Sequence, residues 1–402
     1  MYKDIVLVSA VRTPFGRYGG SLKDFDYFEL GALPVREVLK RVNLDGAHVD
    51  EVYWGVGDTS ACKDVYTPVA ARQTLLKAGL PYTTPSVAID KACVSAMSAV
   101  HYGCRAIVAR EIECAIGGGA TSFGQEPLIV RGLRWNGFRI GEIKMEDPLF
   151  ALGYKDFNPV SVDTDNVATE HGISRQDQDE WALRSHLKYG EAWKAGKFEK
   201  EIMPLSIPQK KGEPVVLDID EQYRPDVSLE KLSKLPGIYG CKNVTAGNAP
   251  GLNDGATAIL FMTRRKATEL GLEPLSEIVS MCSIAVHPNR LPEGPAYAMQ
   301  KVLKLADLIL DDIHVIEINE AFAAVPLVSI LLLTDKNKQK SQTIHKRTNI
   351  NGSAIAIGHP NTASGARIIM NLMYELRRRG GGYALGAICG GLGQADACVI
   401  KV

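Results

Sequence analysis

Two cysteines and one histidine occupy positions where a thiol or an imidazole could do chemistry. Cys389 lies in the run Ala387-Ile388-Cys389-Gly390-Gly391-Leu392-Gly393, and Cys93 lies far upstream in Asp90-Lys91-Ala92-Cys93. His359, in Gly358-His359-Pro360, precedes the glycine run. Each is predicted at a junction between a strand and a helix or turn. The set indicates thiol chemistry in two steps, in which one thiol carries an acyl group and the other moves a proton.

The surroundings of Cys93 favour a reactive thiol without excluding a structural one. The apolar run Ser86-Val87-Ala88-Ile89 predicts a buried strand, and small residues after the cysteine predict a closely packed helix through Ile107. The free N–H groups at such a helix start stabilise a thiolate. The alternative is a buried core cysteine, the interpretation that suits Cys104 and Cys114.

His359 and Asn319 are candidates to assist the thiols. Glycines and Pro360 shape the loop of His359, so that a ring nitrogen can face a thiol. Asn319, in Glu317-Ile318-Asn319-Glu320, follows a predicted strand and can orient water or donate to an oxyanion. It is also suited to cap a helix beginning at Glu320. The glycines around Cys389 leave backbone N–H groups open to a ligand. The other histidines considered are interpreted as structural or surface residues: His101, His171, His186, His287 and His345.

Strand-like and helix-like segments alternate along the chain, which predicts an α/β fold. Residues 38–52 and 302–318 share an order of helix, turn and strand, and so do the segments that follow Cys93 and Ser364. Two duplicated halves explain this order, and chance likeness of common units is the alternative. Residues 122–249 differ in composition and include a capping-box sequence at Ser174–Asp177. Such an insertion is expected to cover a site formed by the halves.

Composition narrows the class of protein. The 402 residues are 46% hydrophobic and 23% charged, and Lys+Arg and Asp+Glu balance at 46 each, so nothing suggests nucleic acid as a partner. The 8 cysteines show no Cys-x-x-Cys pair, which favours free thiols in a reducing cytoplasm. The early strand Ile5–Val8 leaves no room for a signal peptide, the longest apolar run, 321–333, is too short to span a membrane, and Ile400-Lys401-Val402 is not a peroxisomal address.

Four separated motifs together resemble the thiolase family. They are Cys93 before a small-residue helix, Asn319-Glu320-Ala321-Phe322, Gly358-His359-Pro360 and Cys389-Gly390-Gly391, in that order. Val11–Gly16 resembles the family's opening, and Val244–Ala249 with Asn253–Ala256 resembles its central signature. The resemblance extends over nearly the whole chain.

The resemblance implies a thiolase-like fold of two duplicated five-stranded α/β halves with an inserted loop domain that binds coenzyme A. The expected domains are 1–121 with 250–269 returning to it, 122–249, and 270–402. Cys93 would be the acylated nucleophile, activated by His359, which forms one oxyanion hole with a water held by Asn319. Cys389 would take the α-proton, and the N–H groups of Cys93 and Gly391 would form the second oxyanion hole.

The implied reaction is reversible Claisen condensation of acyl-CoA with acetyl-CoA, or thiolysis of a 3-oxoacyl-CoA, in fatty acid and lipid metabolism. CoA and acyl-CoA would be substrates, with no further cofactor and no metal. Arg224, with Ser228 and Leu229, would contact CoA, although Arg224 also suits a surface ion pair. The family implies a homodimer or homotetramer.

The chain departs from the family pattern at three places. Asn361-Thr362 replaces Leu-Gly after His-Pro, Pro250 replaces a serine, and Ser161-Val162 stands where short-chain members carry His-Met. A smaller Val162 predicts a wider acyl pocket, which admits longer or α-branched chains beside acetoacetyl-CoA. Two other functions are weighed: a decarboxylating ketoacyl synthase, which the second cysteine disfavours, and a thiolase-like scaffold without turnover, which the complete set of four motifs disfavours.

Overall fold

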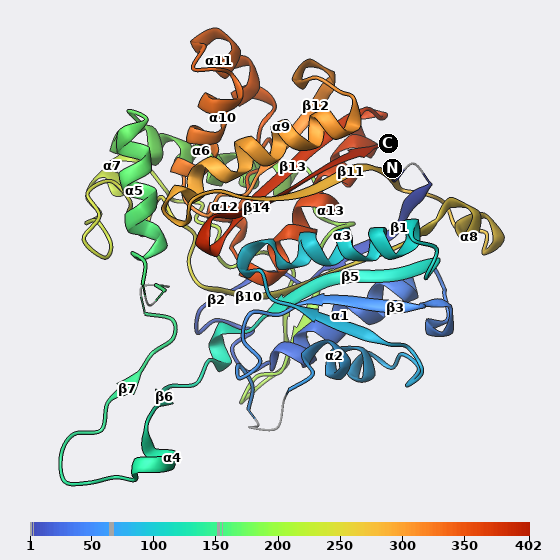
Figure 1. The fold of residues 1–402 in the computed structure, drawn as a ribbon, viewed down its shortest axis with the longest axis horizontal. Coiled ribbons are helices and arrows are strands. Elements are labelled where there is room, and N and C mark those ends of the chain that lie inside the picture. Colours follow the sequence, from blue (N-terminus) through green and yellow to red (C-terminus); the bar gives the residue numbers. More distant parts are fainter. Residues whose placement is uncertain (1, 3, 64–67, 151–152, 155) are drawn as a thin grey trace.

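One mixed sheet organises the chain (Figure 1). The computed structural model describes residues 2, 4–63, 68–150, 153–154 and 156–402. In that part of the chain the sheet has the strand order β12-β13-β14-β11-β1-β10-β5-β3-β4. The strands are β1 (Ile5–Arg12), β3 (Glu51–Gly55), β4 (Ser86–Ile89), β5 (Cys114–Thr121), β10 (Asn253–Thr263), β11 (Ser276–Ala285), β12 (Ile313–Ile318), β13 (Tyr383–Gly390) and β14 (Gln394–Lys401), while β2 (Gly16–Arg17) pairs with β10 beside this path.

The sheet consists of two similar halves joined in the middle. In the first, β3 and β5 are parallel, while β5–β10 and β10–β1 are antiparallel. In the second, β12 and β13 are parallel, while β13–β14 and β14–β11 are antiparallel. Val6 and Leu7 of β1 pair with Glu277 and Ser276 of β11 at the junction. The predicted α/β fold with duplicated halves is therefore confirmed. At the position equivalent to that of β4, the second half has an isolated bridge between Ile316 and Thr348 instead of a strand.

Two central helices form the largest shared core. α3 (Ser95–Val108) belongs to the first half and α13 (Asn361–Arg379) to the second. They pack on each other so closely that a Cβ on Gly365 would lie 2.5 Å from the backbone nitrogen of Met97. Apolar side chains from both helices and both sheet halves make one buried cluster. The starts of α3 and α13 are thereby brought together at one end of the core.

The remaining helices cover the outer faces of the two halves. α1 (Tyr27–Arg41), α2 (Ala70–Ala78) and α8 (Arg264–Glu269) pack on the first half; α9 (Gly294–Ala306), α10 (Ala324–Leu333), α11 (Lys338–Arg347) and the short α12 (Ala354–Ile357) belong to the second. Leu30, Val35 and Val38 of α1 are fully buried, spaced as one face of a helix requires. None of the described helices has the length and apolar character needed to cross a membrane.

The chain leaves the sheet after β5 and returns at β10. Between them lie α5 (Val160–Glu170), α6 (Arg175–Lys194), α7 (Leu229–Ser233) and the hairpin β8–β9 (Leu205–Ile207, Val215–Leu217). The predicted capping box of Ser174 and Asp177 is confirmed at the start of α6. An arm of β6 (Ile129–Val130), α4 (Leu133–Asn136) and β7 (Met145–Glu146) extends far from the body (Figure 1).

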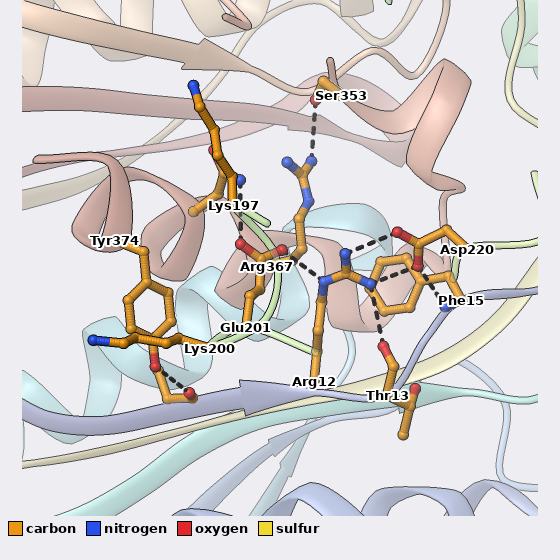
Figure 2. Close-up of polar contacts among 12 residues, drawn as sticks. Arg12, Thr13, Phe15, Lys197, Lys200, Glu201, Asp220, Ser353, Arg367 and Tyr374 are labelled. Carbon is orange, nitrogen blue, oxygen red and sulfur yellow. Dashed lines mark hydrogen bonds and ion pairs between the residues drawn. The ribbon is translucent and has the colours of Figure 1, made fainter. Parts of the chain in front are cut away.

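A buried ion network fixes the insertion to the sheet. Arg12, at the end of β1, donates from Nη1 and Nη2 to the two carboxylate oxygens of Asp220 at 2.6 and 2.9 Å, and from Nε to Glu201 at 2.7 Å (Figure 2). All three side chains are inaccessible to solvent. The opening motif that contains Arg12 therefore has a structural task.

Two local predictions are wrong. β4 is an edge strand rather than a buried one, since it pairs only with β3 in the described sheet and Val87 is 43% exposed. Asn319 does not cap a helix at Glu320, because α10 begins at Ala324. In both cases the local sequence is compatible with the prediction, but the tertiary arrangement gives a different structure.

Candidate active site

The predicted catalytic residues meet in one cavity. Cys93, His359, Cys389 and Gly391 all line a cavity of about 520 Å³. They come from both halves and from segments nearly the whole chain apart. Asn319 joins them from the end of β12, with its side-chain nitrogen 3.5 Å from His359 Nε2. The structure thus gathers all five residues that the sequence singled out for chemistry.

Cys93 lies in a tight turn before α3. The turn η2 (Ala92–Val94) begins with Ala92 in the left-handed region at φ 49°. Two side chains hold it: Asp90 accepts from the Ala92 N–H at 3.0 Å, and Ser95 Oγ accepts from the Lys91 N–H at 2.8 Å. Ser95 also donates to the Ala92 carbonyl at 2.6 Å. An alanine is held in a conformation that glycine adopts more readily, which is the kind of local strain found at functional turns.

The contacts of His359 select its tautomer. Ser364 Oγ lies 2.7 Å from His359 Nδ1 and donates to the Pro360 carbonyl at 2.8 Å. The hydroxyl hydrogen is therefore used, so Ser364 accepts from an Nδ1–H group. Nε2 therefore carries no hydrogen, and it faces the cavity on the side where Asn319 lies. This is the tautomer that can receive a proton from a thiol.

The amide of Asn319 is oriented by a second buried ion network. Arg367 Nη2 donates to Asn319 Oδ1 at 3.3 Å and to Ser353 Oγ at 3.2 Å, and Arg367 also forms an ion pair with Glu317. Because the amide oxygen accepts from Arg367, the amide nitrogen points toward His359. Figure 2 places Arg367 and Ser353 beside the network of Arg12. Sequence reasoning missed Arg367, whose only signal was its place on the helix after His359.

Cys389 is the penultimate residue of β13, and a tight turn follows. The hairpin pairs Cys389 with Ala395, and η6 (Gly391–Gly393) connects β13 to β14. A Cβ on Gly391 would lie 1.8 Å from the Tyr154 hydroxyl, so a larger residue there would displace the Tyr154 side chain. Tyr154 also lines the cavity, and it was not predicted because no pattern in its segment marks it. The absent side chain leaves the Gly391 backbone facing the cavity.

Burial sets the protonation of the three titrating groups. It raises the pKa of Cys93 to about 12, with the Asp90 carboxylate acting in the same direction. It also raises the pKa of Cys389, with a further contribution from Cys93. Burial lowers the pKa of His359 to about 3, helped by the charge of Arg367. The free protein at neutral pH therefore holds two thiols and a neutral imidazole.

The backbone N–H of Cys93 lowers the pKa of its thiol, in the direction that the sequence predicted, but burial has the larger effect and the net shift is upward. The prediction relied on free N–H groups at a helix start, but α3 begins only at Ser95 and Asp90 accepts from Ala92 in the turn. Desolvation of a thiolate outweighs the remaining dipole.

The proposed CoA contacts divide in two. Arg224 lines the main cavity and an adjoining one of about 210 Å³. Ser228 and Leu229 line neither: Ser228 caps α7 by accepting from the Lys231 N–H at 3.2 Å, and Leu229 is largely exposed. Ser228 and Leu229 are adjacent residues at the start of α7.

The residues that depart from the family pattern lie at or beside the cavity, except Val162. Pro250 and Asn361 line it, and Thr362 donates to the Ala120 carbonyl at 2.6 Å just behind. Ser161 also lines it, but Val162 does not belong to the described lining, where Val160 is found instead. Val162 lies two residues from Val160 on α5, about half a turn away, which is why Val160 takes the place in the lining that the sequence assigned to Val162.

Comparisons with known proteins agree along the whole chain. Residues 5–265 match the family described as thiolase, N-terminal domain, and residues 272–402 match thiolase, C-terminal domain. An acetyl-CoA acetyltransferase of Cupriavidus necator is 40% identical over 400 residues, covering 98% of both chains. A probable acetyl-CoA acyltransferase of Staphylococcus epidermidis is 36% identical over 402 residues, covering 99% of this chain and 98% of the relative.

Solved structures show the same likeness. Human mitochondrial 3-ketoacyl-CoA thiolase superposes with a TM-score of 0.92 at 35% identity, covering 99% of both chains. The same enzyme in complex with CoA gives 0.91 at 35% identity, covering 99% of this chain and 98% of the other. Acetyl-CoA acetyltransferase of Bacillus anthracis gives 0.92 at 33% identity, covering 100% of this chain and 99% of the other.

Proposed function

Since the chain belongs to the thiolase family of acyltransferases, we propose that it transfers an acyl group between CoA thioesters through an acyl-cysteine intermediate. The reaction is the reversible Claisen condensation of acyl-CoA with acetyl-CoA, or the thiolysis of a 3-oxoacyl-CoA by CoA. The observation that carries the proposal is the convergence of Cys93, His359 and Cys389 on one cavity. We propose that no cofactor other than the CoA substrates takes part.

The first half-reaction acylates Cys93. His359 Nε2, which carries no hydrogen in the tautomer set by Ser364, takes the proton of the Cys93 thiol. The sulfur attacks the thioester carbonyl, a new C–S bond forms, and the bond to CoA sulfur breaks; the departing CoA sulfur receives the proton back from His359. The N–H groups of Cys93 and Gly391 are proposed to bind the carbonyl oxygen as it gains charge.

The second half-reaction needs a base at the α-carbon. Once CoA has left, Cys389 passes its proton to His359 and then takes an α-proton from acetyl-CoA, and the carbanion attacks the acyl group on Cys93. The C–C bond forms as the bond to Cys93 sulfur breaks, and the departing sulfur takes the proton of His359, which regenerates the thiol. His359 and a water held by Asn319 are proposed to stabilise the enolate oxygen. Thiolysis follows the same steps in reverse.

CoA is proposed to enter along the insertion. Arg224 connects the main cavity to the smaller one, and its guanidinium is suited to a phosphate or the adenine nucleotide. Pro250 also lines the main cavity, and we propose that it contacts the pantetheine arm. Arg224→Ala is expected to raise KM for CoA with little change in kcat, measured in the thiolysis direction. An unchanged KM would exclude Arg224 from the CoA site.

Short-chain substrates are proposed first, with longer or α-branched chains admitted. Val160 and Ser161 give this part of the cavity small side chains. The test is thiolysis of acetoacetyl-CoA, 2-methylacetoacetyl-CoA and 3-oxohexanoyl-CoA by the purified enzyme. Comparable kcat/KM values support the wider range, and a strong preference for acetoacetyl-CoA contradicts it. CoA binding without turnover of any of the three would favour the scaffold alternative.

We propose that the chain assembles with copies of itself as a dimer or tetramer. The edge strand β4 offers unpaired backbone groups to a second copy. The arm between β6 and β7 carries large exposed apolar side chains, Trp135, Phe138 and Ile140. Replacing these three by Ser and measuring mass by light scattering should reduce a tetramer to a dimer. We further propose that the protein acts in the cytoplasm, in fatty acid metabolism. Cell fractionation tests the location, and acyl-CoA profiles of a deletion strain test the metabolic role.

A further inference from the structure

A buried ion pair links the turn of Cys93 to the hairpin of Cys389. Lys91, two residues before Cys93, places its Nζ 3.0 Å from Asp396 Oδ1 on β14. The Asp396 side chain is almost fully buried and that of Lys91 is 16% exposed. Asp396 pairs in register with Ile388, next to Cys389. The pair thus joins the two catalytic turns across the halves.

Every polar atom of the pair is used. Lys91 Nζ also donates to Ser98 Oγ at 2.8 Å and to Ser283 Oγ at 3.1 Å. Both hydroxyls then donate to Asp396, Ser283 at 2.7 Å to Oδ1 and Ser98 to Oδ2. The ammonium has three acceptors for its three hydrogens, and the carboxylate has three donors. A fully satisfied buried network fixes one geometry, because any displacement leaves a charge unpaired.

The backbone confirms how close the two turns lie. A Cβ on Gly390 would be 3.0 Å from the Lys91 carbonyl oxygen and 3.1 Å from a Val94 methyl carbon. The residue after one cysteine therefore contacts the turn that carries the other. Steric contact alone prevents the turns from approaching further, while the ion pair opposes their separation.

We propose that Lys91 and Asp396 are positioning residues that hold the Cys93 turn against the Cys389 hairpin, and so set the distance that acyl transfer needs. This inference rests on the proposed function. The acyl group on Cys93 must be reached from the side of Cys389, and its oxyanion hole draws N–H groups from Cys93 and Gly391. A separation of the turns misplaces all of these at once. Neither residue contacts substrate in this scheme.

The first test separates positioning from stability. Asp396→Asn is expected to lower kcat of thiolysis about tenfold or more, as small displacements at reacting atoms do, with KM for CoA unchanged. Glu375→Gln is the control, because Glu375 is also a buried carboxylate, paired with Lys197 and Arg378 away from the cavity. It should lower the melting temperature but keep kcat. An Asp396→Asn enzyme with normal kcat would overturn the proposal.

The second test uses both partners. Lys91→Met with Asp396→Leu removes both charges and keeps apolar bulk, so folding stability should recover relative to either single variant. The turnover of the double variant should stay low, because the apolar pair has no directional link. Recovery of kcat together with the melting temperature would overturn the proposal.

The third test distinguishes the half-reactions. The probe is a CoA ketone in which methylene replaces the thioester sulfur of acetyl-CoA, which cannot acylate Cys93. Exchange of its methyl protons with deuterated water needs Cys389 and the His359–Asn319 oxyanion hole only. Lys91→Met should slow acylation of Cys93 at least tenfold while exchange changes about twofold or less. Equal losses overturn the proposal, whereas absence of both in the unchanged enzyme counts against the proposed function instead.

Discussion

The two halves of the molecule share an order of elements but divide the chemistry unequally. α3 with β5 in the first half corresponds to α13 with β13 in the second, and the strand pairings repeat. The first half supplies one of the proposed reacting groups, Cys93, before α3. The second supplies His359 before α13, Asn319 after β12 and Cys389 at the end of β13. A duplicated scaffold thus carries two different parts of one site.

The correspondence shows which residues are equivalent. Cys93 precedes the central helix of its half as His359 precedes that of the other, so the proposed nucleophile and its proposed base occupy matching places. Cys389 is the penultimate residue of β13, as Ala120 is of β5. The two cysteines therefore do not occupy equivalent places in the two halves. Their proximity comes from α3 packing on α13, which brings the helix starts together.

The largest effect on activity should come from replacing each of the two cysteines by serine in turn. Cys93→Ser is expected to abolish acylation and turnover, by about 10³-fold or more, because a hydroxyl is a far weaker nucleophile here. Cys389→Ser should leave acylation of Cys93 by acyl-CoA largely intact and cripple condensation. Intact-protein mass spectrometry after acyl-CoA addition measures the first step, and thiolysis measures both.

Two matched arginines allow the halves to be compared directly. Arg367 pairs with Glu317 and orients Asn319, while Arg12 pairs with Asp220 and Glu201 away from the reacting groups. Replacing either by Met leaves buried carboxylates unpaired and should cost about 3–5 kcal/mol in the free energy of unfolding.

The two arginine variants should differ in activity. In Arg367→Met, Asn319 also loses its orientation, so kcat per folded enzyme should fall about tenfold or more. In Arg12→Met, kcat per folded enzyme should change little. Chemical denaturation gives the stability, and thiolysis at saturating CoA gives kcat. Equal kcat in the two variants would show that the Arg367 network has no part in positioning.

Acid should expose a further difference. The folded protein lowers the pKa of His359 to about 3, mainly by burial and then by the charge of Arg367. The unfolded chain, with an ordinary histidine pKa of about 6.5, binds more protons between these values. The contribution of His359 to the free energy of unfolding is therefore fully present above about pH 6.5. It is lost as pH falls, by about 1.4 kcal/mol per pH unit for each such site.

The pH effect can be assigned by substitution. Burial also lowers the pKa of His101 on α3 to about 4, so the first half contributes to the same slope. His359→Asn should reduce the slope of unfolding free energy against pH between 4 and 6 by about 1.4 kcal/mol per unit, measured by denaturation at several pH values. His48→Gln, on a surface turn, is the control. An unchanged slope for His359→Asn would mean that the imidazole is not buried neutral.

The sequence predicted the residues that line the site better than the residues that hold them in place. Cys93, His359, Asn319 and Cys389 stand in short motifs whose neighbours are small or glycine, so their placement at turns could be read locally. Arg367 and Lys91 could not, because a cation on a helix or loop looks solvated until its buried partner, Glu317 or Asp396, is known from the fold. The edge position of β4 and the direction of the Cys93 pKa likewise depend on tertiary burial, which local pattern does not contain.

The smallest effect tests where the insertion meets the two halves. Val160, at the start of α5, lines the cavity that Cys93 and Cys389 share, and Val162 does not line it in the described chain. Val160→Met adds volume toward the acyl group, so kcat/KM for 3-oxohexanoyl-CoA should fall several-fold, within the roughly 10–200-fold limit for one methylene-sized change, while acetoacetyl-CoA is little affected. Val162→Met is the matched control and should change neither rate. A loss for Val162→Met instead would place that side chain at the acyl group and return the width of the pocket to the position first predicted from sequence.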